Sequence, residues 1–393
     1  MKILLIHNFY RSGNPGGEDN VVRQERALLE RHGHEVVLYQ RSNDEVDEHD
    51  AIAAARTALG MGWSRRSHRE VAGLVRRERP DVAHVHNTFP LVTPSVYAAC
   101  REGGVPVVQT LHNYRWLCAA ATFYRQDALC ELCGPARVGP ALRHRCYRGS
   151  LLGSAAVARA QRRAWRDGSY AQAIDAYITL SRFAAARFVT AGLDAARVHV
   201  KPNFVDDGDP PGAGDGGYVV YAGRLSSEKG LTTLLDAWRG LRDIPLRIAG
   251  DGPLLAGLRA RATREGLPVQ FLGLRSRDEV RATIGGAALL VLPSQWFEGF
   301  PLVLVEAYAR GTPVVAARIG SLAELVLPGE TGLHFAAGDA AGLAARVREL
   351  WADDARRQRL RHGARARFDA EYTAPRNLGL LLDIYRAAGA VAR

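Results

Sequence analysis

The chain alternates short apolar runs with longer segments in which apolar residues recur every three or four positions. Residues 2–7 predict a buried strand, residues 8–17 a glycine-containing loop, and residues 18–32 an amphipathic helix that Gly33 ends. Further strands are predicted at 35–39, 82–85, 105–111 and 176–180. Strands that alternate with helices indicate a mostly parallel sheet covered on both faces.

A break in this pattern divides the chain. Residues 203–217 are rich in Asn, Asp, Pro and Gly, which propagate neither helix nor strand, and they predict a linker. The alternation then restarts, with strands and helices predicted at 218–222, 230–241, 246–249, 254–265, 269–272 and 288–292. The pattern predicts an α/β protein of two Rossmann-like domains, with the ligand in a cleft at the carboxyl ends of both sheets.

The predicted domains are therefore residues 1–205 and 206–374. A final helix over 375–390, within a C-terminal segment 375–393, is expected to pack on either domain, including back on the first.

Composition supports a globular, two-domain chain. Its 393 residues are 47% apolar and 24% charged, which excludes a disordered chain and a small disulfide scaffold. No apolar run approaches the roughly 18 residues of a membrane span, and the first ten residues are too short for a signal peptide. We therefore expect a soluble, cytoplasmic protein.

The net charge of +11 suggests anionic partners. Arginines cluster in the first half, at 65, 66, 69, 76, 77 and 79 and again at 143, 145, 148, 159, 162, 163 and 166. They are compatible with a lipid-linked acceptor and peripheral membrane contact at the inner face, or simply with solvated helix faces. Aromatic residues are not interleaved with them, so nucleic acid is disfavoured.

Two carboxylates in the second half mark a candidate ligand site. Glu298 and Glu306 are separated by seven residues, and the turn Gly299-Phe300-Pro301 leads into the predicted helix that carries Glu306. Carboxylates there can accept from sugar or ribose hydroxyls, while backbone N–H groups at a helix start can donate to phosphate. An isolated pair of this kind also fits an ordinary helix start with one exposed Glu.

A second loop supplies cations. Arg224 and Lys229 lie between a predicted strand and a predicted helix, close to Gly223 and Gly230. Two converging cations suit a diphosphate, whose charge they would neutralise as it leaves.

Together with Gly250-Asp251-Gly252-Pro253, these motifs resemble those of the family 4 retaining glycosyltransferases of GT-B fold. In the first half, Gly16-Gly17-Glu18 is similar to the family's glycine-rich first loop, and Leu111-His112-Asn113 to its histidine after a strand. Ser181 and Asn203 fall at the family's positions before the linker. Phe204 departs from the glycine common there, which leaves the sugar identity open.

The resemblance implies a hexosyltransferase that uses a UDP- or GDP-sugar and retains the anomeric configuration, in polysaccharide or glycoconjugate biosynthesis. It implies no metal or other cofactor for catalysis. Arg224 and Lys229 would bind the diphosphate, and Glu306 the ribose. Glu298 would hold sugar hydroxyls, and His112 would face the reacting carbon. The other donor-binding residues implied are Gly16, Gly17, Gly223, Gly252, Gly299, Phe300, Pro301 and Leu302. The acceptor-side residues implied are Glu18, Asn113, Ser181 and Asn203.

Gly16 and Gly17 are expected in a turn of positive φ that lets the chain approach the diphosphate or acceptor closely. A merely tight turn is the alternative.

Other functions remain open at this point. A nucleotide-sugar epimerase or phosphorylase would share the two-domain shape, and so would a non-catalytic nucleotide-sugar-binding subunit. A dehydrogenase is disfavoured because residues 8–17 lack the Gly-x-Gly-x-x-Gly spacing.

An insertion over 114–150 carries four cysteines and little apolar periodicity. Cys118, Cys130, Cys133 and Cys146 have the order C-x11-C-x2-C-x12-C. We expect a structural zinc ion on these thiolates, with His144 as a substitute ligand, since a segment without its own core needs a staple. Two disulfides, disfavoured in the cytoplasm, and ordinary thiols are the alternatives.

Overall fold

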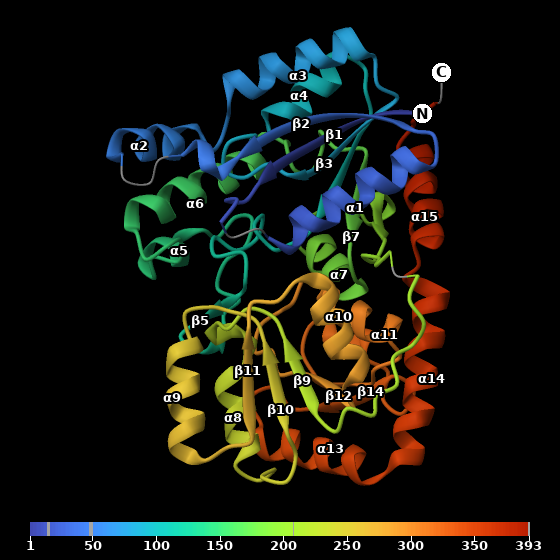
Figure 1. Ribbon diagram of the computed structural model, residues 1–393. Helices are drawn as coiled ribbons and strands as arrows, with labels where there is room; N and C mark the ends of the chain where they lie inside the picture. Colours follow the sequence, from blue (N-terminus) through green and yellow to red (C-terminus); the bar gives the residue numbers. More distant parts are fainter. Residues whose placement is uncertain (14–15, 47–49, 207, 392–393) are drawn as a thin grey trace. The chain divides into compact units, whose positions relative to one another are not determined.

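The computed structural model describes residues 1–13, 16–46, 50–206 and 208–391, and the chain divides into two compact units (Figure 1). The N-terminal unit comprises Met1–Phe123, Cys130–Pro202 and Asn377–Arg393. The C-terminal unit comprises Tyr124–Leu129 and Asn203–Arg376. Both are α/β units built on a parallel sheet, as the alternation predicts.

The N-terminal unit contains a six-stranded sheet of order β2-β1-β3-β4-β7-β8, in which every pair of neighbours is parallel. Its strands are β1 (Lys2–Phe9), β2 (Glu35–Ser42), β3 (Val82–Asn87), β4 (Val107–Leu111), β7 (Ala176–Thr179) and β8 (Val198–Val200). Its longer helices are α1 (Gly17–Arg31), α2 (Ala51–Gly60), α3 (Arg65–Glu78), α4 (Ser95–Glu102), α6 (Leu151–Arg166) and α7 (Arg182–Thr190). The strand order reverses between β1 and β3, which places the loops after these strands at a topological switch point.

The C-terminal unit repeats the plan with the order β11-β10-β9-β12-β13-β14. Its strands are β9 (Val219–Ala222), β10 (Leu246–Ala249), β11 (Val269–Gly273), β12 (Leu289–Leu292), β13 (Val314–Ala317) and β14 (Gly332–Phe335). Its α-helices are α8 (Leu231–Trp238), α9 (Leu255–Glu265), α10 (Arg277–Gly286), α11 (Leu302–Ala309), α12 (Leu322–Leu325), α13 (Ala340–Ala352) and α14 (Asp354–Glu371). Here the switch point lies between β9 and β12.

Strands β4, β7, β9, β12 and β13 are entirely buried, and the predicted strand positions agree with the structure to within three residues. The ends of the predicted helices also agree to within three residues. The first helix begins at Gly17 and ends at Arg31, and the last, α15, spans Ala374–Ala387. Residues 14 and 15 of the predicted loop and residue 207 of the predicted linker lie outside the described residues.

Within the predicted insertion, the structure places a short hairpin of β5 (Tyr124–Arg125) and β6 (Ala128–Leu129), followed by the short helix α5 (Gly139–Arg143). Among the described residues, no helix combines the length and the apolar character that crossing a membrane requires.

Candidate functional site

The candidate donor site in the C-terminal unit is organised around an ion pair between Lys229 and Glu298. Lys229 ends a short 3-10 helix, η3 (Ser227–Lys229), after β9, and Glu298 lies in the loop after the adjacent strand β12. Nζ of Lys229 lies 2.7 and 3.0 Å from the two carboxylate oxygens of Glu298. The Ser294 hydroxyl donates to the same carboxylate at 2.6 Å, so Glu298, which is only 6% exposed, is held in place from two sides.

Gly230 explains how closely these two loops approach. It has φ of 73°, and a Cβ there would lie 1.8 Å from the carbonyl oxygen of Pro293, so no side chain fits. The backbone N–H of Gln295 also donates to the Glu228 carbonyl at 2.8 Å. Backbone contact therefore fixes the spacing of the two loops.

Arg224 is the more exposed of the two predicted cations. Its side chain is 54% exposed and pairs with Glu228 at 2.8 Å. Burial raises the pKa of Glu228, but hydrogen bonds from Ser226 and the nearby charges of Arg224 and Lys229 outweigh it and lower that pKa overall. A carboxylate thus holds the Arg224 guanidinium near the loop that carries Lys229.

Glu306 has a partner that the motifs did not reveal. Nε of Arg277, the first residue of α10, lies 3.2 Å from Oε1 of Glu306 in α11. The two residues are 29 positions apart, and none of the sequence motifs includes Arg277. Arg277 therefore joins the candidate donor-site residues.

The helix that carries Glu306 begins without a side-chain cap. Pro301 is its N-cap residue and offers no hydrogen-bonding side chain, so the first N–H groups of α11 remain open to an anion. Phe300, beside it, is buried with its ring edge against Tyr372. Gly223 and Gly252 lie in the loops after β9 and β10, where a Cβ at Gly252 would meet the Leu225 carbonyl at 2.6 Å.

In the N-terminal unit, Glu18 contacts the predicted residue Asn113 and also Asn87, which was not predicted. One of its carboxylate oxygens accepts from Asn87 at 2.9 Å and the other from Asn113 at 3.1 Å. Burial is the main cause that raises the pKa of Glu18. These side chains come from α1, from the last residue of β3 and from the loop after β4, next to the switch point of this sheet.

The expectation of positive φ at the first glycine turn is wrong for both Gly16 and Gly17. Gly16 is extended, with φ of −79° and ψ of 156°, and caps α1, while Gly17 is the first helical residue. Gly16 is nevertheless constrained, because a Cβ there would lie 2.6 Å from the Tyr10 ring. No heavy atom lies within 4 Å of the Cβ position at Gly17.

His112 follows β4 and contacts a second histidine. Its Nε2 lies 2.8 Å from Nδ1 of His86 in β3. Both rings border a cavity of about 40 Å³, which has room for water and not for a sugar, together with Asn87 and Asn113. His112 and the Glu18–Asn113 pair are thus brought to one part of the N-terminal unit.

Ser181 and Asn203 belong to different units of the chain. The Ser181 hydroxyl accepts from the N–H of Ala184 at 3.1 Å and caps α7, and its side chain is buried. Asn203 is buried and is the first residue of this part of the C-terminal unit. Their acceptor-side roles stay predictions.

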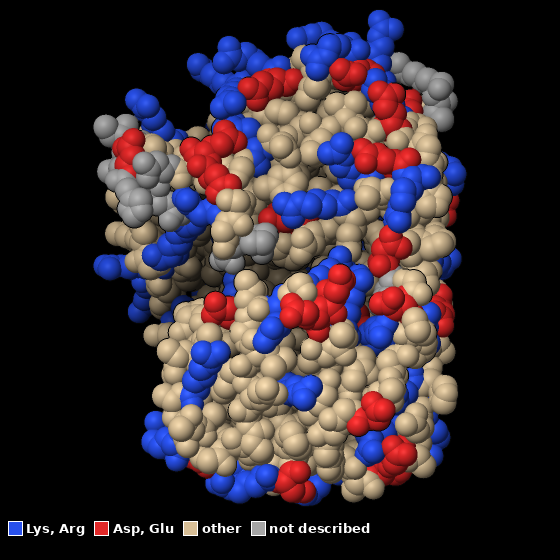
Figure 2. Space-filling view, viewed as in Figure 1, with Lys and Arg blue, Asp and Glu red and all other residues tan. Residues whose placement is uncertain are grey.

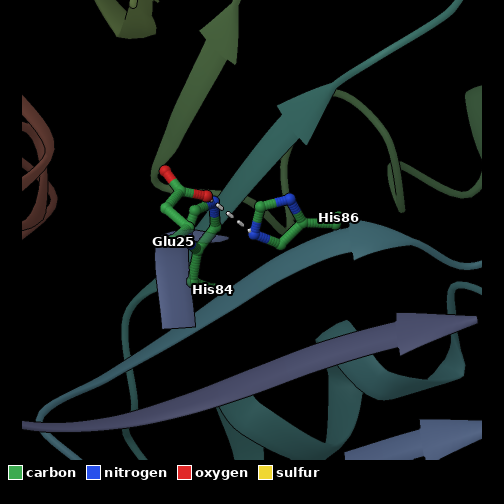
Figure 3. Close-up of side chains that lie close together, drawn as sticks. All are labelled: Glu25, His84 and His86. Carbon is green, nitrogen blue, oxygen red and sulfur yellow. Dashed lines mark ion pairs between the residues drawn. The ribbon is translucent and has the colours of Figure 1, made fainter. Parts of the chain in front are cut away.

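A cluster of buried ionisable side chains includes His86, the partner of His112. Glu25 of α1 lies against His84 and His86, which alternate along β3, with ligand atoms of all three within 4.8 Å of one another (Figure 3). Figure 3 marks the contact between the Glu25 carboxylate and Nε2 of His86, which measures 3.2 Å. The His-x-His spacing in a predicted strand was the only signal for this cluster.

All four cysteines of the insertion are free thiols. Burial raises the pKa of Cys133 to about 11, helped by the neighbouring Cys118, Cys146 and Cys130. The thiols are thus close enough to influence one another, and the zinc site stays a prediction.

Comparisons with known proteins agree with this architecture. The family model described as Glycosyltransferase Family 4 matches residues 15–209, and the model described as Glycosyl transferases group 1 matches residues 208–367. Glycogen synthase of Mycobacterium tuberculosis is 39% identical over 160 residues, which is 39% of this chain and 38% of that relative. The alpha-D-kanosaminyltransferase of Streptomyces kanamyceticus is 28% identical over 302 residues, 75% of this chain and 73% of the relative.

Among solved structures, a crystal structure of Anabaena HepE in complex with UDP matches with a TM-score of 0.69 at 20% identity, covering 100% of both chains. The same Anabaena protein is also described in complex with UDP-glucose. The fold is therefore that of the GT-B glycosyltransferases, two Rossmann-like units in one chain. The chain belongs to glycosyltransferase family 4.

Proposed function

We propose that the protein transfers a hexosyl group from a nucleotide-diphosphate sugar to an acceptor hydroxyl, with retention of the anomeric configuration. The observation that carries this proposal is the Lys229–Glu298 pair at the switch point of the second sheet. It places a cation next to a carboxylate that can accept hydrogen bonds from sugar hydroxyls. A diphosphate next to a sugar needs these two groups next to each other.

Each group of the donor site has a distinct role in this proposal. Lys229 has three donors on Nζ, so it can bind a phosphate oxygen while it still contacts Glu298. Arg224 and the open N–H groups of α11 add positive charge for the diphosphate. Glu298 accepts from hydroxyls of the donor sugar, and Glu306, oriented by Arg277, accepts from the ribose diol.

The chemistry follows from where charge develops. The bond between the anomeric carbon and the diphosphate oxygen breaks, and the cations stabilise the departing diphosphate. The acceptor oxygen then bonds to the same face of the sugar, and its proton passes to the leaving phosphate oxygen. This route needs no nucleophile from the protein and no divalent cation, because Arg224, Lys229 and α11 supply the positive potential.

We propose UDP- or GDP-sugars as donors, since a protein of the same fold has been crystallised with UDP and UDP-glucose. A lipid-linked acceptor at the inner membrane face is favoured by exposed arginines of α3, namely Arg65, Arg66, Arg69, Arg76 and Arg77. Figure 2 shows Lys and Arg side chains crowded over the end of the N-terminal unit that carries α3, with some carboxylates among them.

Binding measurements on matched variants test the donor site. Lys229→Ala and Glu306→Ala should weaken binding of free nucleoside diphosphate by about 1–3 kcal/mol each, the worth of a charged hydrogen bond. Glu298→Ala should weaken binding of the nucleotide sugar more than that of the nucleoside diphosphate. Calorimetry with UDP, GDP and their sugars measures both effects, and unchanged binding in all three variants would show that the site is elsewhere.

A further inference from the structure

Four buried or partly buried groups connect His112 to helix α15 through a continuous series of contacts. Nε2 of His112 lies 2.8 Å from Nδ1 of His86, and Nε2 of His86 lies 3.2 Å from Oε2 of Glu25. Oε1 of Glu25 lies 2.7 Å from Nζ of Lys201, which donates to Oδ1 of Asn377 at 3.0 Å. This series crosses β4, β3 and α1 within the N-terminal unit.

The charges in this series compensate each other. Glu25 and Lys201 are each 1% exposed, and a buried charge without a partner is strongly destabilising. Lys201 is one of only three lysines in the chain, beside Lys2 and Lys229. We therefore take Glu25 as a carboxylate whose charge the Lys201 ammonium neutralises.

The two histidines are neutral. Burial, together with the neighbouring histidines and Lys201, lowers the pKa of His86 and of His112 well below the ordinary value for histidine. A neutral imidazole carries one N–H and one lone pair. Which nitrogen is the donor is then set by the groups around the ring.

The proton positions on the two histidines follow from the charged end of the series, which is the Glu25–Lys201 pair. Nε2 of His86 and both carboxylate oxygens of Glu25 lack an aligned hydrogen-bond partner among the described residues, and Nε2 lies 3.2 Å from Oε2 of Glu25. We assign the proton to Nε2 because a carboxylate attracts an N–H and repels a lone pair that faces it. Nδ1 of His86 is then a lone pair and accepts from Nε2–H of His112. Nδ1 of His112 is left as an acceptor, and no hydrogen bond occupies it within the described part of the chain.

We infer that Glu25 is a positioning residue that acts through His86 to fix His112 in its Nε2–H form, so that Nδ1 of His112 can accept a hydrogen bond from a hydroxyl. That this hydroxyl belongs to the donor sugar rests on the proposed function. The assignment of the proton does not.

The neighbouring groups do not offer a competing explanation. Glu25, His84 and His86 have the spacing of metal ligands, but the Lys201 ammonium already contacts the carboxylate, and a second cation there would be repelled. His84 is engaged at both nitrogens, by the Tyr385 hydroxyl and by Thr110, at 2.8 Å each. His7, the remaining histidine nearby, contacts Asp19 at 2.8 Å through Nε2.

Glu25→Gln tests the inference because it exchanges the donor and acceptor roles along the series while it keeps the side-chain shape. The Lys201 ammonium will take the amide oxygen, so the amide NH₂ faces Nε2 of His86 and donates to it. His86 must then carry its proton on Nδ1, and His112 must move its own proton from Nε2 to Nδ1. The control is Tyr385→Phe, which removes one hydrogen bond from His84 in the same cluster and leaves the series to His112 intact.

The readout is the ¹⁵N chemical shifts of the histidine ring nitrogens, which distinguish a protonated nitrogen from a lone pair. In the parent protein and in Tyr385→Phe, Nε2 of His112 should be protonated, and in Glu25→Gln the proton should be on Nδ1. A parent protein whose His112 is protonated on Nδ1 would overturn the inference without any variant. A Glu25→Gln protein with the parent pattern at His112 would also overturn it.

Steady-state kinetics separate this inference from the proposed function. If Nδ1 of His112 binds the donor sugar, Glu25→Gln should lower kcat by on the order of 10–100-fold, the usual effect of losing a residue that orients a site. If the proton moves as expected and kcat stays at the parent value, the tautomer assignment holds and the role of His112 in transfer is wrong.

Discussion

Gly16 and Gly17 are adjacent in the sequence, yet the structure constrains them differently. Gly16→Ala should lower Tm by a few degrees, because its Cβ would collide with the Tyr10 ring. Gly17→Ala should leave Tm unchanged or raise it, since alanine favours the helix that begins there and meets no atom within 4 Å.

The same pair of variants tests whether a ligand approaches the chain closely at these glycines. If a ligand uses the open space at Gly17, Gly17→Ala should reduce turnover while Tm is preserved. Thermal unfolding and initial rates measured on the same samples decide this point. A Gly17→Ala protein with parent turnover would limit the role of this glycine to the helix start.

His84 makes stability depend on pH. Burial lowers its pKa from 6.5 to about 4, so the unfolded chain binds a proton more readily than the folded one between these values. The stability that neutral His84 contributes to the folded state is complete above pH 6.5 and is lost as the pH falls toward 4. By pH 5 the free energy of unfolding is lower by about 2 kcal/mol. Urea unfolding at pH 7 and pH 5 should show a smaller loss for His84→Gln than for the parent, and equal losses would contradict the assignment.

At the residue scale, local motifs could be predicted and distant partners could not. Lys229 and Glu298 follow adjacent strands of the C-terminal sheet, so parallel-sheet logic brings them together. Arg277, Glu25 and Lys201 were missed because their contacts depend on packing: Lys201 meets Asn377 from 176 residues away. No periodicity in the sequence encodes such a pair.

The insertion combines buried and exposed segments. Cys133 and Cys146 pack against a small buried cluster of Met61, Ala119, Ala141 and Val157, whereas the strand residues of its hairpin are all at least partly exposed. Structural zinc should therefore stabilise it by holding four thiolates. We expect about one zinc per chain by elemental analysis of protein purified without chelator. Less than about 0.2 zinc per chain, with four thiols that titrate freely, would exclude the metal.

Most strands were predictable from short apolar runs. Strands such as β10, with its apolar run, have the predicted bounds of 246–249. Strands β8, β13 and β14 had no predicted counterpart, although β13 is four residues long, like β10, and is entirely buried.

At the scale of the whole molecule, each of the two parallel sheets has a switch point. Ligands bind at the carboxyl ends of such strands, so candidate residues are expected in the loops that follow them. The fold class followed from the alternation alone. The division of the chain is less simple than a linker at 206, because the N-terminal unit includes Asn377–Arg393 and the C-terminal unit includes Tyr124–Leu129. Tertiary contacts assign these short segments to their units, so the sequence pattern does not predict the assignment.

The central claim is retaining transfer driven by protein cations. Time-resolved NMR of an α-linked UDP- or GDP-sugar, with chelator present and water or a supplied alcohol as acceptor, tests it most directly. We predict that the nucleoside diphosphate is released and that the α-configured product appears first, with Lys229→Ala slower by at least about tenfold. A β-configured first product, or cleavage that occurs only after Mg²⁺ or Mn²⁺ is added, would contradict the account.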